Sequence, residues 1–134
     1  MQQIISRIAS QHGVNLNEGD AHLRLEQQSF MPLVIENIGP NHVSVAHYFV
    51  LEGDMITDPE VVFFTGYEEW VPISIQHPFG GVQSVAEVDE EARAITRLAP
   101  KAQADVASFC RIWARNIKAQ GWLDSGNKAK RVSV

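Results

Sequence analysis

The sequence predicts an α+β domain: five or six mostly antiparallel strands between residues 22 and 88, a short amino-terminal helix, and a long carboxy-terminal helix packed on one face of the sheet. Hydrophobic residues alternate with polar ones through much of 22–88, which is typical of half-buried strands. They recur every three or four positions in 102–120, which is typical of a helix with one buried side. A chain of 134 residues, 45% of them hydrophobic, is large enough to bury a core of its own.

The first elements follow from local spacing. Ile4, Ile5, Ile8 and His12 share one face at helical spacing, and Gly13 stands where a helix commonly ends. Alternating segments, together with a segment at 61–65 that has no polar side, then predict strands at 22–28, 33–38, 42–51, 61–65, 70–76 and 82–88.

Single residues set several boundaries. The sequences at 52–54 and 58–59 are rich in Gly, Asp and Pro, and they predict two turns. Pro72 lacks a backbone donor, which predicts an edge position for the strand at 70–76. Acidic residues at 89–91 predict the start of a short helix.

The carboxy-terminal third predicts a helix of about five turns that ends at Gly121. Its apolar face carries Val106, Phe109, Trp113 and Ile117. We expect residues 1–122 to form a single domain and residues 123–134 to form a basic, flexible tail.

The charge distribution suggests a protein partner. Residues 18–91 hold fourteen carboxylates against one cation, whereas residues 92–134 hold nine cations against two carboxylates, and the formal net charge is −5. The two halves could neutralise each other within the domain, or an acidic face could bind a partner with a basic surface. Glu52, Glu68 and Glu69 are the candidate contacts for such a partner.

The sequence leaves two other kinds of partner open. A nucleic acid could meet the cations of the long helix, Arg111, Arg115 and Lys118, but the acidic segment would oppose it. A homo-oligomer is compatible with the sequence. No apolar run approaches the roughly 18 residues that cross a bilayer, and Cys110 is the single cysteine, so we expect a cytoplasmic protein with no membrane span.

No complete catalytic signature is present: the sequence contains no GxSxG, GxxxxGK[ST], GxGxxG, HExxH or CxxC motif. We therefore expect no cofactor, no resident metal and no established catalytic residue. Cys110 follows the pattern of a small buried residue rather than a nucleophile.

One polar group leaves an enzymatic alternative open. His47 is in phase with the apolar residues of its strand, and Asp54, Asp58 and Glu60 follow closely. An imidazole with several carboxylates could bind a divalent metal or transfer protons. We favour a structural interpretation, in which the buried histidine forms a hydrogen bond with one acceptor. The aspartates then accept hydrogen bonds from backbone amides of their own turns.

The segment that contains this group also resembles a known family. His47-Tyr48-Phe49, Gly53-Asp54-Met55 and 58–63 follow the order of a motif that reads approximately HYxxxNGDxMxDPExxF. It is similar to a motif of uncharacterised bacterial proteins of plasmids, integrative conjugative elements and phages, and it departs from that motif at Glu52, where asparagine is expected. The resemblance covers about residues 23–122 and implies an accessory protein of a mobile genetic element without an established active site.

Overall fold

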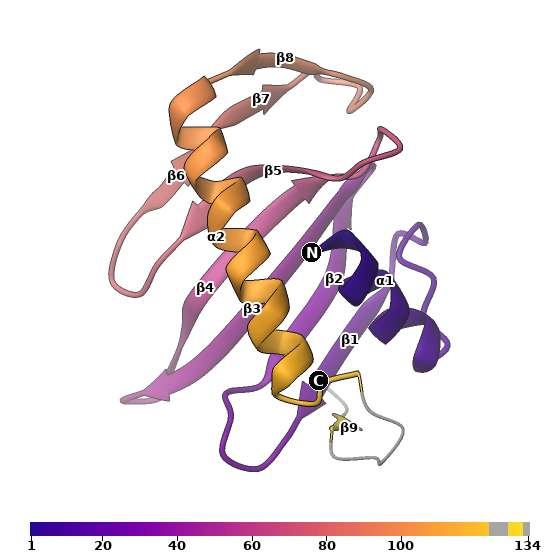
Figure 1. The fold of residues 1–134 in the computed structure, drawn as a ribbon, viewed down its shortest axis with the longest axis vertical. Coiled ribbons are helices and arrows are strands. Elements are labelled where there is room, and N and C mark those ends of the chain that lie inside the picture. Colours follow the sequence, from indigo (N-terminus) through magenta and orange to yellow (C-terminus); the bar gives the residue numbers. More distant parts are fainter. Residues whose placement is uncertain (124–128, 133–134) are drawn as a thin grey trace.

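The computed structural model describes residues 1–123 and 129–132 and confirms the α+β class. Its elements are α1 (Gln2–Gln11), β1 (His22–Glu26), β2 (Leu33–Gly39), β3 (His42–Leu51), β4 (Asp54–Phe64), β5 (Val71–Gln76), β6 (Val82–Ser84), β7 (Ala86–Val88), β8 (Ile95–Leu98), α2 (Pro100–Ala119) and β9 (Lys130–Val132). The short amino-terminal and long carboxy-terminal helices are present as predicted (Figure 1).

The main sheet has seven strands in the order β6-β5-β4-β3-β2-β1-β9, and every neighbouring pair is antiparallel. The prediction of five or six strands was therefore too low. The seventh strand, β9, lies in the segment for which the sequence predicts a flexible tail, and it pairs with β1. Residues 124–128 and 133–134 of that segment lie outside the described residues, so the boundary at Trp122 stays a prediction.

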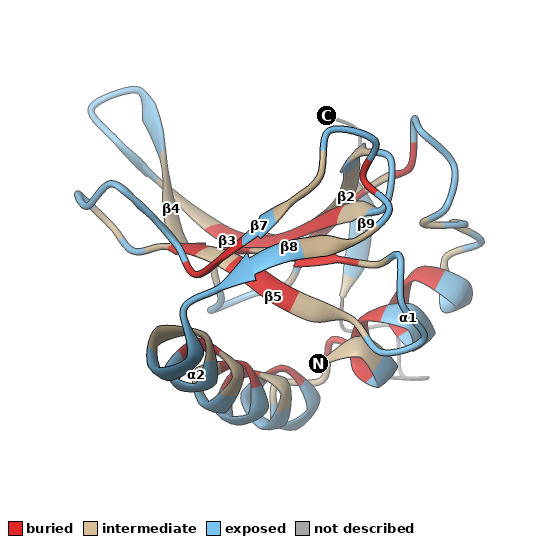
Figure 2. Cartoon of the chain, turned by 90° about the horizontal axis from the view of Figure 1, so that it is seen from above, coloured by how far each residue is buried: buried red, intermediate tan, exposed pale blue. Residues whose placement is uncertain are grey.

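Both helices cover the same face of the main sheet (Figure 2). α2 buries Val106, Cys110, Trp113 and Ile117 there, because these residues recur every three or four positions. They join one hydrophobic core with the inward residues of α1 and of strands β1 to β5. In the described chain, no helix is both long and apolar enough to span a membrane.

A second, smaller cluster lies where β7 and β8 form their own two-stranded sheet. Ala86 of β7 packs with Phe64 and Ile73 of the main sheet. The predicted single strand at 82–88 is thus two strands, β6 and β7, that belong to different sheets.

The turn predicted at 58–59 is wrong. β4 runs through both residues, and Asp58 and Pro59 together lie opposite the single residue His47 of β3. Such a bulge admits an extra residue without ending the strand, so turn-forming residues do not break it.

Two further boundary predictions are also wrong. β5 is not an edge strand, because β6 pairs with it at 74–76. Pro72 is tolerated because it lies outside that pairing, on the stretch of β5 that pairs with β4. The acids at 89–91 lie in the β7–β8 hairpin instead of a helix, and the Asp89 carboxylate accepts backbone hydrogen bonds from Arg93 and Ala94.

Candidate functional site

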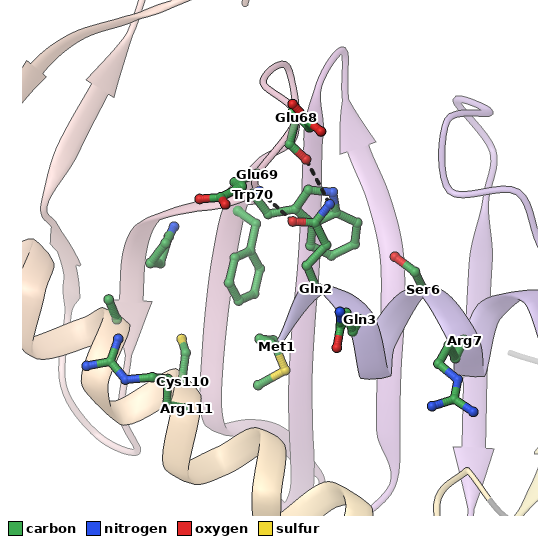
Figure 3. Close-up of a pocket in the computed structure, with 13 residues that line it drawn as sticks. Met1, Gln2, Gln3, Ser6, Arg7, Glu68, Glu69, Trp70, Cys110 and Arg111 are labelled. Carbon is green, nitrogen blue, oxygen red and sulfur yellow. Dashed lines mark hydrogen bonds between the residues drawn. The ribbon is translucent and has the colours of Figure 1, made fainter.

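A cleft of about 860 Å³ opens between the two helices and the β4–β5 connection (Figure 3). It combines an aromatic surface, polar side chains of α1 and charges of both signs. Its lining residues are Met1, Gln2, Gln3, Ser6, Arg7, Phe63, Glu68, Glu69, Trp70, Pro72, Ala107, Cys110 and Arg111.

Gln2 fixes the position of the cleft wall that carries Glu68 and Glu69. Its side-chain amide donates to the carbonyl of Glu68 at 3.0 Å, and its oxygen accepts the backbone N–H of Trp70 at 2.8 Å. The Trp70 ring packs on Phe63, with 5.8 Å between the ring centroids. The backbone of 68–70 is therefore bound to α1 and to the core, while the side chains of Glu68 and Glu69 stay exposed.

The charges of this cleft are unpaired within it. Neither Glu68 nor Glu69 forms an ion pair with a residue of the described chain. Across the cleft, Arg7 of α1 and Arg111 of α2 are exposed, and the Arg111 guanidinium donates to Ser108 at 2.8 Å. The cleft thus has carboxylates on one wall and guanidinium groups on the two helices. The wall with the carboxylates can bind a cationic group of a ligand.

Cys110 also lines the cleft, and burial raises the pKa of its thiol to about 11. A thiolate is the nucleophile in thiol chemistry, and an ordinary cysteine has a pKa of about 8.5. We therefore expect Cys110 in the folded protein at pH 8 to react with a disulfide reagent at least about a hundredfold more slowly than in the unfolded chain. Labelling by an aromatic disulfide, followed by absorbance with and without denaturant, measures the ratio; equal rates would contradict this assignment.

The structure places His47 in the core. Its side chain is 7% exposed, and its ring lies 5.7 Å from the ring of Trp113 and 5.8 Å from that of Trp122. Nδ1 lies 3.2 Å from the carbonyl oxygens of Met31 and Pro32, and because a carbonyl only accepts, Nδ1 carries the proton. Burial lowers the pKa of His47, against the smaller effects of both carbonyls and of Asp58.

The three carboxylates that follow His47 in the sequence do not assemble around it. Asp58 is close enough to affect the pKa of His47, but Asp54 is exposed at the start of β4. Glu60 pairs with Ala46, whose side chain points to the opposite face from that of His47, and it accepts a 2.6 Å hydrogen bond from Ser44 there. Among residues 1–123 and 129–132, no three His, Cys, Asp or Glu side chains are grouped as metal ligands would be.

The candidate protein-binding acids lie in two places. Glu52 is in the β3–β4 turn, whereas Glu68 and Glu69 follow the other end of β4. β4 has eleven residues, and at about 3.3 Å per residue it separates the two places by roughly 35 Å. These acids therefore belong to two separate surfaces.

Sequence reasoning missed Gln2, Arg7 and Trp70 as residues of the cleft. Gln2 and Trp70 are 68 positions apart, and no spacing within the sequence brings them together. The single available signal was the unpaired excess of acid at 68–69 beside an aromatic residue.

The fold and the cleft together define an α+β domain with an antiparallel sheet, two helices on one face, and a charged groove between them. Residues 3–123 match a family model described as Domain of unknown function (DUF6908), and the chain belongs to that family. No curated protein and no solved structure matches it.

Proposed function

We propose that this chain is an accessory protein of a mobile genetic element that acts by binding another protein in the cytoplasm. The mobile-element context rests on the resemblance of the motif at 47–63. The cytoplasmic setting rests on a lone cysteine in the sequence, which is buried in the fold. The observation that carries the binding proposal is that Glu68 and Glu69 are exposed on the fixed wall of the cleft and form no ion pair with a residue of the described chain.

The chemistry of the cleft selects the kind of partner. Exposed carboxylates attract Lys or Arg and mainly accelerate association, because exposed charges act over several ångströms before contact. Trp70 and Phe63 add an aromatic surface beside them. The partner segment that fits carries a basic side chain next to an apolar one.

Charge reversal tests this proposal. We expect Glu68→Lys combined with Glu69→Lys to slow association with a partner captured from the host at least about tenfold at low salt, with little effect on folding. Surface plasmon resonance gives the association rate, and raising the salt should reduce the difference, because charges are screened over about 8 Å at physiological ionic strength.

Glu87→Lys combined with Glu90→Lys is the matched control. It makes the same change in net charge at exposed positions of the β7–β8 hairpin, away from the cleft. Equal slowing by both double variants would show that only overall charge matters, and the cleft would lose its role.

A further inference from the structure

Among the strands of residues 1–123 and 129–132, none lies beside the outer end of the β3–β4 hairpin. β2 pairs with β3 as far as His47, and β5 pairs with β4 from Glu60 onward. Within the part of the chain that the structure describes, residues 49–51 and 54–56 therefore pair only with each other. A two-stranded ribbon of this kind is marginally stable by itself and gains from packing on another surface.

This ribbon is also unusually apolar for an exposed surface. Val50 is 69% exposed and pairs with exposed Met55, while Leu51 follows on the other side. Phe79 of the β5–β6 loop is 76% exposed and lies beside Phe49, with 6.2 Å between the ring centroids. We call the exposed residues of this corner the hairpin patch; it consists of Val50, Leu51, Met55 and Phe79, with Glu52 and Asp54 at the turn.

The outer side of α2 has the complementary composition. Ile112 is 55% exposed, and Arg115 and Lys118 follow it at helical spacing on the solvent side. Neither cation forms an ion pair with a residue of the described chain. We call these three residues the α2 face.

The hairpin patch and the α2 face of one molecule cannot contact each other. Figure 2 shows the exposed side of α2 directed away from the sheet, whereas the hairpin is part of the sheet. A second molecule can bring its hairpin to this side of the helix. Contact would bury apolar residues on both surfaces and place the carboxylates of Glu52 and Asp54 near the cations.

We infer that the protein self-associates head to tail, with the hairpin patch of one copy on the α2 face of a second copy. This inference goes beyond the proposed function and uses neither Glu68 nor Glu69. Because the two surfaces differ, the contact is heterologous. Each copy of a pair keeps the surface that it has not used, so the pair has one free hairpin patch and one free α2 face for further addition.

Sedimentation equilibrium over a range of concentrations tests the inference. We expect the average mass of the wild-type protein to rise above that of the monomer with concentration and to fall when salt is added. Glu52→Lys with Met55→Lys, and separately Ile112→Glu with Arg115→Glu, should each weaken self-association at least about tenfold, because each places like charges against the other surface. Ile38→Lys, at an exposed apolar residue of β2, should leave it unchanged.

Mixing the two double variants gives the decisive result. Each variant retains the surface that the other has lost, so an equimolar mixture should form a one-to-one dimer that grows no further. Circular dichroism of each variant checks that it is folded. A wild type that stays monomeric up to about 1 mM, a double variant that assembles like the wild type, or a mixture that stays monomeric would each overturn the inference.

Discussion

Replacing Trp113 by alanine is expected to lower the free energy of unfolding by about 3–5 kcal/mol, as large-to-small changes at buried aromatic residues do. Trp113 is 5% exposed on the inner side of α2. Its ring lies 5.7 Å from that of His47 and 5.9 Å from that of Phe109, so it joins the long helix to β3. The change removes the largest side chain of this contact and leaves a cavity that rigid neighbours fill poorly.

Urea denaturation, followed by fluorescence and by circular dichroism, measures this loss. Ile112→Ala is the matched control, because it truncates the adjacent, exposed residue of the same helix and should change stability by less than about 1 kcal/mol. A Trp113→Ala protein within about 1 kcal/mol of the wild type would contradict the packing of α2 on the sheet.

Replacing His47 by glutamine is expected to lower stability by about 1–3 kcal/mol at pH 7.5 and by less at pH 5. At neutral pH the buried imidazole is uncharged, and its Nδ1–H serves the carbonyls of Met31 and Pro32 between two tryptophan rings. Its pKa is lower in the folded than in the unfolded chain, so the unfolded chain binds more protons as the pH falls below about 6.5. The wild type therefore loses stability from His47 on acidification, and the glutamine variant lacks this loss.

The pH profile should be measured in a His12→Gln background. Burial and the neighbouring Arg131 also lower the pKa of His12, so that residue contributes to the same pH range. In this background, the slope of stability between pH 7 and pH 5 should be smaller in the His47→Gln protein. An unchanged slope would mean that His47 binds its proton equally well in the folded and the unfolded chain, so that burial does not lower its pKa.

The elements that were predictable from sequence are those with long, regular patterns. β3 was predicted with its observed bounds, and α2 was predicted within two residues, because ten alternating residues and four buried helix positions leave little ambiguity. The inward direction of His47 followed from the same alternation.

The wrong predictions concern residues that fit two different local structures equally well. Asp58-Pro59 favours a turn, but a bulge accepts it within a strand. The carboxylate of Asp89 would suit the start of a helix, yet it holds the β7–β8 hairpin through backbone amides just as well. Pro72 lacks a backbone donor only at its own position, so it does not prevent β6 from pairing with β5 at residues 74–76.

The cleft was beyond sequence reasoning for a different reason. Its walls come from the start of α1, the β4–β5 connection and the middle of α2, which meet only through the tertiary fold. The Gln2 side chain joins two of these segments through hydrogen bonds with Glu68 and Trp70, and a glutamine near a chain end carries no pattern that indicates such a role.

Site-specific photo-cross-linking in the host tests most directly whether the cleft binds a protein partner through Glu68 and Glu69. A photoreactive residue at Gln3, which is exposed and lines the cleft, should capture a partner, and one at exposed Thr96 of β8 should not. The Gln3 adduct should disappear when Glu68→Lys and Glu69→Lys are introduced into the same chain. An adduct that survives this charge reversal, or one that forms at Thr96 and not at Gln3, would contradict binding at the cleft.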